Sequence, residues 1–288
     1  MTSEATRFRL DIAYQGTDFS GWGRQPELRT VQGVLEGALA TILRRAGKPP
    51  TLTVAGRTDA GVHAAGQVAH IDLSPEQVAA LRKPHGKRSP LPAHEALARR
   101  LNGVLGPVPD VVVIRAAEAP AGFDARFSAL WRRYEYRLAD RASLRDPLQR
   151  HRTAWVSATL DDDAMDLAAH GMLGLHDFAS YCKARDGATT IRTLLGYSWR
   201  RNPDGVLIGE VVADAFCHSM VRALVGACVE VGEGELTAGE LLMLREERRR
   251  TNAFKVMPAR GLTLLEVGYP ENAELGRRAE LTRGLRSL

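Results

Sequence analysis

Hydrophobic and polar residues alternate in several short stretches of the chain, and longer stretches between them carry apolar residues at helical spacing. In the first alternating stretch, residues 7–14, one face carries Phe8, Leu10, Ile12 and Tyr14. A period of two is typical of a half-buried strand. By the same reasoning, the first half of the chain predicts a strand at 7–14, a helix at 30–47, strands at 51–55 and 67–73, a helix at 93–105 and a strand at 111–115.

The second half of the chain repeats this order of elements without repeating the sequence. Residues 201–205, Arg-Asn-Pro-Asp-Gly, are of types that strongly favour a tight turn, and they predict a hairpin. Thr237 and Glu240 form the pattern of a capping box at the start of a helix. The predicted elements are a strand at 127–138, a helix at 161–173, strands at 190–200 and 206–213, helices at 216–232 and 237–250, and a strand at 262–269.

Each half therefore has the order β-α-β-β-α-β, which is ferredoxin-like. We expect an α+β fold in which two ferredoxin-like units pack as a pseudosymmetric pair. In that arrangement they share a continuous, mostly antiparallel mixed sheet and a central basic cleft, a usual place for a site. The expected boundaries are an N-terminal domain at 1–115, a C-terminal domain at 116–270 and a charged tail at 271–288 that frays.

The composition is that of an ordinary globular protein, with 44% hydrophobic and 25% charged residues. The formal net charge is +5, and since only five of the 39 basic residues are lysines, 34 are arginines. The planar guanidinium of arginine suits phosphates and stacked bases, so the charge favours a polyanionic partner. A bias toward arginine also follows from genome composition. No apolar run is long enough for a signal peptide or a membrane span, which predicts a cytoplasmic protein without membrane contact.

The three cysteines, Cys182, Cys217 and Cys228, form no CxxC pair and no cluster with histidine at metal spacing. Their odd number argues against a disulfide framework. Cys217 and Cys228 are eleven residues apart, about three helical turns, so we expect buried thiols on one helix face.

The stretch with the most chemical character is residues 54–70, which contains Gly56, Gly61 and Gly66. Glycine is used where the backbone takes a positive φ or approaches another group closely. Because predicted strands flank this stretch, we expect a glycine-hinged loop that displays its side chains.

Within this loop, Arg57 and Asp59 place a cation and a carboxylate two positions apart. An aspartate in a glycine-rich connection commonly bonds its own backbone in an Asx-turn. Asp59 is therefore a candidate for either a turn residue or a reactive carboxylate.

The sequence Gly56-Arg-Thr-Asp-Ala-Gly-Val-His63, followed by Gly66-Gln-Val-Ala-His70, resembles the signature of the TruA family of tRNA pseudouridine synthases. Further segments resemble the same family in order along the chain, at residues 14–25 with 30–36, 123–129 with 132–136, and 215–222 with 258–262. The basic loop at 81–92 looks longer than is usual for this family. The resemblance covers about residues 10–269.

This resemblance implies that Asp59 is the catalytic carboxylate, that Arg57 handles the base during flipping, and that Tyr134 stacks on the target uracil. It also implies that Arg222 is a buried partner of Asp59 and that Leu262 packs beside the base. From the residues alone, Tyr134 is equally suited to a strand core, and Arg222 to a snorkelling position at the surface.

Candidates for contacts with RNA are Arg24, Arg126, Arg132, Arg133 and His218. Arginines on a solvated strand edge, or a histidine with internal hydrogen bonds, have the same appearance in a sequence.

A metal site is not expected. His63 and His70, near Asp59 and Asp72, match no compact ligand pattern, and no third ligand follows. Isomerisation of uridine to pseudouridine needs no redox change, group donor or hydrolytic water, so no cofactor is implied either.

The resemblance implies a tRNA substrate modified at uridines 38–40 of the anticodon stem-loop, and a homodimer in which one subunit orients RNA for the other. Two alternatives stay open. One is a non-catalytic RNA-binding protein on the same scaffold, and the other is a pseudouridine synthase that acts on another RNA.

Overall fold

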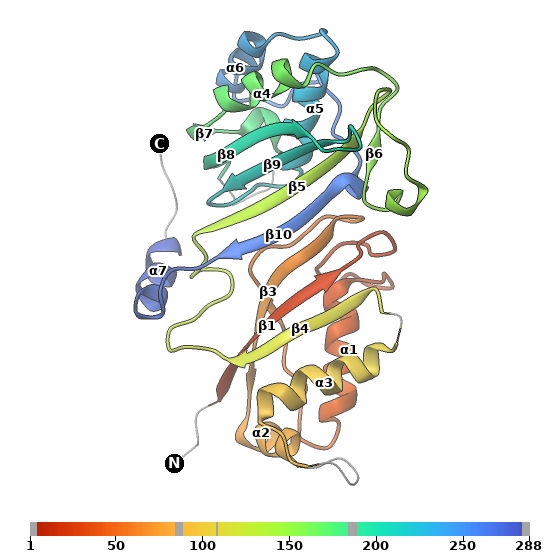
Figure 1. Ribbon diagram of the computed structural model, residues 1–288. Coiled ribbons are helices and arrows are strands. Elements are labelled where there is room, and N and C mark those ends of the chain that lie inside the picture. The colour runs from red at the N-terminus through yellow and green to blue at the C-terminus, as the bar shows by residue number, and fades with distance from the viewer. Residues whose placement is uncertain (1–4, 84–88, 108, 184–188, 284–288) are drawn as a thin grey trace. The chain divides into compact units, whose positions relative to one another are not determined.

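The computed structural model describes residues 5–83, 89–107, 109–183 and 189–283 (Figure 1). The chain divides into two compact units. Unit 1 contains the residues up to Ala129 together with Tyr269–Arg283, and unit 2 contains Leu130–Gly268.

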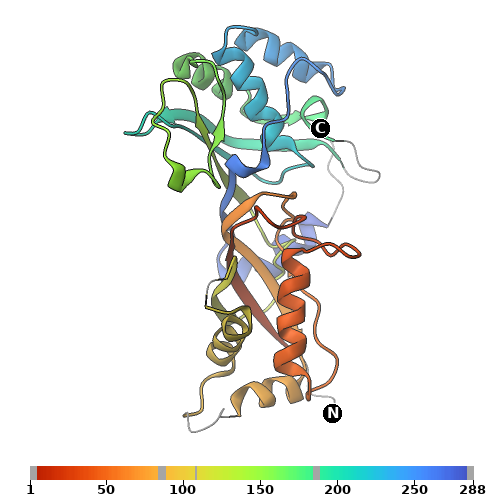
Figure 2. The ribbon, with the colours of Figure 1, turned by 90° about the vertical axis from the view of Figure 1, so that its right-hand side faces the viewer.

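Unit 1 is built on an antiparallel sheet with the strand order β4-β1-β3-β2. Alternate residues of β1 are buried from Phe8 to Tyr14, as the period of two predicts. In Figure 2 the helix α1 (orange) runs alongside the strands of this unit. The elements are β1 (Thr6–Tyr14), α1 (Val31–Leu43), β2 (Thr53–Val54), β3 (His63–Leu73), α2 (Pro75–Arg82), α3 (Ala93–Leu105) and β4 (Val111–Glu118).

Local signals explain where the helices of unit 1 begin. Thr30 caps α1 by accepting a hydrogen bond from the backbone N–H of Gly33 at 3.2 Å. α3 has the predicted bounds. α2 was not predicted from the pattern, although Ser74 and Gln77 form a complete capping box in front of it. Its short length and weak amphipathic pattern concealed it, and it occupies the start of the expected loop at 81–92, of which residues 84–88 lie outside the described residues.

Unit 2 repeats the topology of unit 1. Its strands have the order β10-β5-β9-β8-β7. Strand β5 lies between β10 and β9, as β1 lies between β4 and β3 in unit 1, and β7 is added at the edge. The sheet is mixed because the short β6 pairs with β5 in parallel, whereas the other pairs are antiparallel. The elements are β5 (Trp131–Ala139), β6 (Ala154–Trp155), α4 (Asp162–Gly171), β7 (Gly174–Asp177), β8 (Ile191–Arg201), β9 (Leu207–Ala213), α5 (Met220–Gly232), α6 (Ala238–Glu246) and β10 (Leu262–Gly268).

The two faces of the unit 2 sheet differ. Tyr134 lies opposite Val211, which lies opposite Tyr197, so the three side chains share one face. The hydroxyl of Tyr197 donates to Cys228 Sγ of α5 at 3.2 Å, which identifies this as the face that α5 covers. The next residues along β5, with odd numbers, point to the other face. We call this second surface the open face of unit 2.

These observations confirm an α+β fold with two units of the same strand order, as the sequence predicts. How the two units pack, and whether a basic cleft lies at their centre, stay predictions.

The described part of the segment expected as a fraying tail is largely helical. Asn272–Glu274 forms a 3₁₀ turn that leads into α7 (Leu275–Thr282), and residues 284–288 lie outside the described residues. Leu275 and Ala279 are buried, and the hydroxyl of Ser128 donates to the carbonyl of Leu275 at 3.0 Å. The charged composition concealed these two apolar residues, which lie one helical turn apart and anchor the helix.

The expectation of free thiols is wrong for two of the three cysteines. Cys182 and Cys217 form a disulfide across 35 residues, with a Cα–Cα distance of 5.8 Å. A backbone hydrogen bond from Lys183 N to His218 O at 3.0 Å holds the same two segments together. Residue spacing cannot reveal such a pair, because the contact is long-range. Cys228 is a buried free thiol, as expected.

Candidate active site

The loop that carries Arg57 and Asp59 connects β2 to β3 in unit 1. β3 begins at His63, earlier than predicted, so Gly66 is a strand residue rather than a hinge. Of the three glycines, only Gly61 has a positive φ, +78°. The loop is therefore shorter and more firmly held than the sequence suggests.

A second segment, residues 16–22, closes over this loop by backbone contact. Trp22 N donates to Thr58 O at 3.1 Å, and Gly61 N donates to Phe19 O at 3.2 Å. A Cβ atom at Gly16 would lie 2.0 Å from the carbonyl oxygen of Val62, so only glycine fits there. The segment resembling the family at residues 14–25 thus has a structural role beside the Asp59 loop.

The centre of the loop is fixed by a buried hydrogen-bond network. Thr58 Oγ1 and the Tyr14 hydroxyl lie 2.7 Å apart. Gln67 Nε2 donates to the Tyr14 hydroxyl at 3.2 Å and to the carbonyl of Gly56 at 2.9 Å. Burial raises the pKa of Tyr14 to about 12, against the opposing effect of its hydrogen bonds with Thr58 and Gln67, so the phenol stays protonated. Sequence reasoning missed this network, because its members are 44 and 53 residues apart.

The side chains on either side of Thr58 differ from it in exposure. Thr58 is buried, whereas Arg57 is exposed and Asp59 is partly exposed. Arg57 lies against Gly23, since a Cβ atom there would come within 3.4 Å of Arg57 Nε. The loop is held at its middle residue and presents the two charged residues that flank it.

In unit 2, the predicted stacking residue Tyr134 lies on β5, on the face covered by α5. Its ring is 8% exposed and meets the ring of Phe216 edge-on, with centroids 5.1 Å apart. Phe216 precedes α5, which begins four residues later than predicted, and it has no role in the predictions above. The only sequence signal for a role of Phe216 was its place in the 215–222 segment that resembles the family.

Two other predicted substrate residues lie in the same unit. Arg222 is in the first turn of α5, partly buried, and its Nε donates to the carbonyl of Met257 at 2.6 Å. Leu262 is buried at the start of β10 and lies opposite Tyr136 of β5. The Tyr136 hydroxyl donates to the carbonyl of Pro258 at 2.8 Å. β5, β10 and the start of α5 thus hold three predicted substrate residues in one folding unit.

The predicted RNA contacts have varied surroundings. Arg24 pairs with Glu36 at 3.3 Å and keeps 71% of its side chain exposed. Arg126 lies over the ring of Phe127, with its Cζ atom 5.0 Å from the centroid. His218 is exposed just before α5.

The two neighbouring arginines of β5 point to opposite faces. Arg132 is buried on the face of Tyr134 and donates from Nη1 to the carbonyl of Asp214 at 2.7 Å. Arg133 is on the open face and pairs with Glu266. Any RNA contact by Arg132 therefore competes with an internal hydrogen bond.

The two histidines that raised the question of a metal accept backbone hydrogen bonds. His63 Nδ1 accepts from Gly16 N at 2.9 Å, and His70 Nδ1 accepts from Ala125 N at 3.0 Å. Burial lowers the pKa of His70, and the charge of Arg7 lowers it further. In the described part of the chain, no three His, Cys, Asp or Glu residues cluster as a metal would need.

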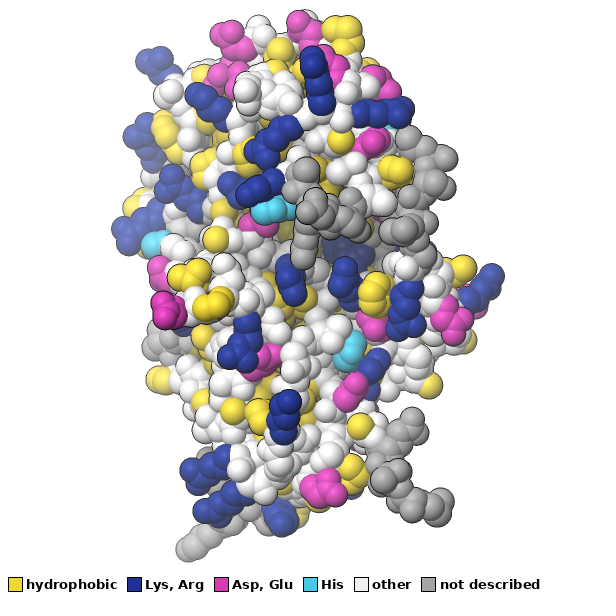
Figure 3. All heavy atoms as spheres, turned by 180° about the vertical axis from the view of Figure 1, so that it is seen from behind, with side chains coloured by type: hydrophobic (Ala, Val, Ile, Leu, Met, Phe, Trp, Pro, Cys, Tyr) yellow, Lys and Arg dark blue, Asp and Glu magenta, His cyan; other side chains and the backbone are white. Residues whose placement is uncertain are grey.

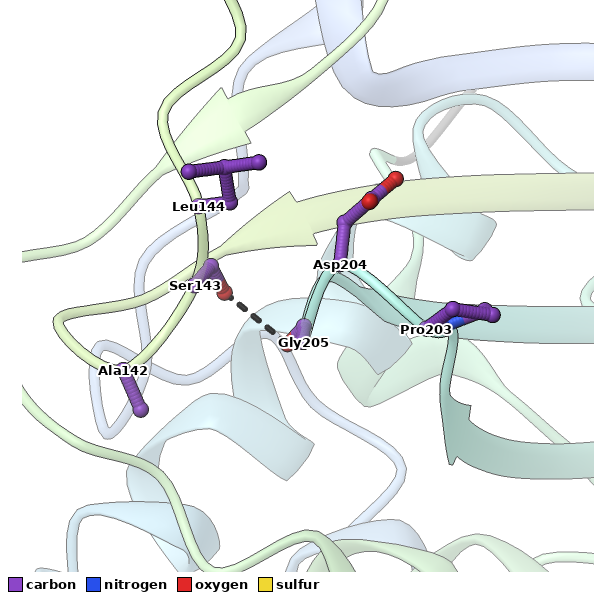
Figure 4. Close-up of a pocket in the computed structure, with 6 residues that line it drawn as sticks. All are labelled: Ala142, Ser143, Leu144, Pro203, Asp204 and Gly205. Atoms are coloured by element: carbon purple, nitrogen blue, oxygen red, sulfur yellow. Dashed lines mark hydrogen bonds between the residues drawn. The ribbon is translucent and has the colours of Figure 1, made fainter.

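A pocket of about 550 Å³ lies at the turn between β8 and β9 (Figure 4). It is lined by Ala142, Ser143, Leu144, Pro203, Asp204 and Gly205, none of which is a predicted site residue. Ser143 Oγ donates to the carbonyl of Gly205 at 3.0 Å and so joins the two walls.

The surface is rich in cations. Figure 3 shows Lys and Arg side chains spread over one face of the chain, with fewer Asp and Glu among them. No helix in the described residues is long and apolar enough to cross a membrane.

The sequence of this chain is similar to those of known RNA-modifying enzymes. A family model described as tRNA pseudouridine synthase matches residues 168–270. The chain is 81% identical to tRNA pseudouridine synthase A of Leifsonia xyli subsp. xyli over the full length of both. It is 53% identical to the enzyme of that name from Streptomyces griseus, with 98% of this chain and 94% of the other aligned. It is 48% identical to the one from Mycobacterium leprae, with 99% and 97% aligned.

These matches define the class first: the chain is a pseudouridine synthase, an isomerase that modifies RNA. Within that class it belongs to the tRNA pseudouridine synthase A family, which is the family that the sequence motifs indicated.

Proposed function

We propose that this protein converts uridine to pseudouridine at positions 38–40 of the tRNA anticodon stem-loop, with Asp59 as the catalytic carboxylate. Membership of the tRNA pseudouridine synthase A family supports the reaction and the tRNA substrate. The observation that carries the role of Asp59 is the braced loop: buried Thr58 is hydrogen-bonded in place, and Asp59 beside it is partly exposed.

The reaction is an isomerisation in which atoms and electrons balance within the nucleotide. The N1–C1′ bond breaks, a C5–C1′ bond forms, the C5 proton leaves, and N1 takes up a proton. Asp59 attacks the nucleotide or assists cleavage of the glycosidic bond. No cofactor or metal takes part in this scheme.

The base must leave its stack before the carboxylate can reach the sugar. Extrusion costs a few kcal/mol, and less from a loop or a helix end than from a regular stem. Arg57, which is exposed next to Thr58, displaces and replaces the base. Tyr134 stacks on the extruded uracil. Stacking holds the base by dispersion and does not depend on which pyrimidine is present. Phe216, edge-on to Tyr134, fixes the plane of that ring.

The remaining roles follow the family. Arg222 is the partner of Asp59, and Leu262 packs beside the base. Arg24, Arg126, Arg132, Arg133 and His218 contact RNA. The protein acts in the cytoplasm as a homodimer in which one subunit orients the tRNA that enters the other.

The decisive experiment compares Asp59→Asn with the wild type. We expect the variant to bind tRNA within a few-fold of wild type and to release no tritium from a transcript labelled at C5 of uridine. Asp163→Asn is the matched control, because Asp163 is an exposed aspartate at the start of α4 and its loss removes the same charge. Wild-type turnover by Asp59→Asn would remove this carboxylate from the mechanism.

A second experiment tests Tyr134. If stacking is its main role, Tyr134→Phe keeps most of the activity and Tyr134→Ala loses about 5- to 150-fold, since base stacking contributes about 1–3 kcal/mol. The measurement is kcat/KM for tRNA. Equal loss in both variants would assign the role to the hydroxyl instead.

The non-catalytic alternative makes a different prediction for the same assays. A protein that only binds RNA would show no tritium release in any variant, and Asp59→Asn would be indistinguishable from wild type. Mapping pseudouridines in cells that lack the protein distinguishes a tRNA substrate from another RNA.

A further inference from the structure

The open face of unit 2 carries a group of arginines that the proposed reaction does not use. Arg137 of β5 lies opposite Ile208 of β9, and Ile208 lies opposite Arg200 of β8. Residues directly opposite each other in antiparallel strands share a face, so Arg137 and Arg200 flank Ile208 in one row. Burial lowers the pKa of Arg137, and the charge of Arg152 lowers it further, which places Arg152 close to the same row.

Arg137 has no internal partner that explains its position. It is partly buried, and its Nε atom is fully covered without a hydrogen-bond partner. Within the described residues, neither Arg137 nor Arg200 takes part in a recorded hydrogen bond or ion pair, whereas Arg152 donates to Glu135 at 3.1 Å. A covered donor without an acceptor destabilises the fold, and neighbouring like charges add to the cost. Within the described residues, no hydrogen bond or ion pair of Arg137 offsets this cost.

A second covered polar atom lies beside it. Thr153 Oγ1 is buried without a hydrogen-bond partner, and Thr153 directly precedes β6. β6 pairs with β5 in the register Leu138 with Ala154, which brings Thr153 level with Arg137 on the same face. A hydroxyl and a guanidinium at one spot can both donate to an oxyanion.

The row of arginines borders a small buried apolar cluster. Ile208, between Arg137 and Arg200, is a member of this cluster, and Trp155 of β6 packs against it. The guanidinium of Arg145 lies over the Trp155 ring, with Cζ 3.7 Å from the centroid. The carboxylates within reach of Arg137 are Glu135, already paired with Arg152, and the exposed Asp204.

We propose that Arg137, Arg152 and Arg200 form a phosphate-binding site on the open face of unit 2, and that the bound phosphate belongs to the tRNA backbone outside the anticodon stem-loop. The guanidinium fork fits two phosphate oxygens, and contacts of this kind position RNA without reading its sequence. The second half of the proposal rests on the proposed function, since it takes tRNA as the ligand.

The sheet separates this site from Tyr134. Tyr134 and Arg137 are three residues apart on the same strand, so their side chains leave opposite faces of unit 2. A nucleotide stacked on Tyr134 cannot also place its own phosphate at Arg137. The phosphate therefore belongs to another nucleotide, which our proposal places outside the stem-loop, and the contact contributes to binding rather than to chemistry.

The test uses the full chain with Arg137→Gln and the double variant Arg137→Gln/Arg200→Gln. For full-length tRNA we expect KM and Kd to rise roughly tenfold in the double variant with kcat unchanged, and the slope of log K against log salt to fall by about one to two. A short anticodon stem-loop RNA should bind all variants equally. Inorganic phosphate, titrated by calorimetry, should bind wild type more tightly than the double variant.

Arg249→Gln is the control, because Arg249 is exposed and paired with Glu247, so its loss removes the same charge from a surface without this cluster. The melting temperature of every variant should be no lower than that of wild type, because within the described residues Arg137 has no internal partner to lose.

The outcomes separate the possible sources of the phosphate. Loss of phosphate binding with unchanged tRNA binding supports the site and assigns it to a free phosphate. Equal weakening of stem-loop and full-length tRNA overturns the location outside the stem-loop. Unchanged binding of both tRNA and phosphate overturns the site itself. Binding is measured without turnover, so a wild-type protein that makes no pseudouridine would refute the proposed function and leave this test intact.

Discussion

Replacement of Thr58 by valine tests whether the buried network is what positions Asp59. Valine keeps the shape of threonine and removes only its hydroxyl. The hydroxyls of Thr58 and Tyr14 share a hydrogen bond of 2.7 Å in which either can donate, and Gln67 also donates to the oxygen of Tyr14. In Thr58→Val the Tyr14 hydroxyl loses this partner, in a site where Gln67 is fully buried. A buried polar group left without a partner costs about 1–3 kcal/mol.

This cost has two expected consequences. The melting temperature falls by about 2–4 °C per kcal/mol for a protein of this size. The rate falls as well, because the loop that carries Asp59 loses its central attachment, and a displacement of about 1 Å at a catalytic group costs on the order of 100-fold. We therefore expect kcat for tRNA to fall by at least about tenfold, with Kd for tRNA nearly unchanged.

The assay is single-turnover tritium release at a temperature well below the transition, so that loss of folded protein does not contribute. A double-mutant cycle with Thr58→Val and Tyr14→Phe measures the coupling energy across this bond; Tyr14→Phe also removes an acceptor of buried Gln67, so that single variant should lose stability as well. Wild-type kcat in Thr58→Val, at any loss of stability, would refute the view that this network positions Asp59.

Two further predictions concern stability. Gly16→Ala should unfold the protein or displace the Asp59 loop, since its Cβ would lie 2.0 Å from Val62 O. Gly37 is a helical position with open space around it, so Gly37→Ala should stabilise the protein by about 0.5–1 kcal/mol; chemical denaturation of both variants measures the difference. Burial alone raises the pKa of Asp140, but its hydrogen bonds, chiefly from Arg201, outweigh this and hold the pKa at about 2. Because the pKa of Asp140 is lowered in the folded state, its contribution to the free energy of unfolding is complete above about pH 4 and is lost as the pH falls toward 2. Asp140→Asn should therefore flatten the curve of unfolding free energy against pH in this range, and an unchanged curve would contradict the lowered pKa of Asp140.

Much of the fold followed from local patterns. The helix at 93–105 has the predicted bounds, and the strand at 7–14 is off by one residue. Both carry a strong period over their whole length, and local periodicity is enough for such elements. The family also followed from the sequence, because the motif around Asp59 is long and contiguous, and the close relatives confirm it.

The errors occur where distant contacts overrule local preference. Gly66 looked like a hinge, yet β3 extends through it, because β1 supplies a pairing partner as far as Ala64, which lies opposite Tyr14. Helix 216–232 begins only at Met220, since Ser219 takes a left-handed φ of 63° and the preceding residues are tied to the Cys182 segment. These interactions join residues far apart in the chain, and no window of sequence contains both partners.

From its sequence alone, the chain specified its family, its order of strands and helices, and the residue types available for chemistry, because periodicity, caps and contiguous motifs are local properties. The tertiary structure alone decided which of those residues are braced and which lack partners. Thr58 is held by Tyr14, whose hydroxyl accepts a second hydrogen bond from Gln67 on another strand. Arg137 lies in a row with Arg200 only because β9 separates their strands. Hydrogen bonding and desolvation depend on distance in space, and that distance is set only when the strands pair.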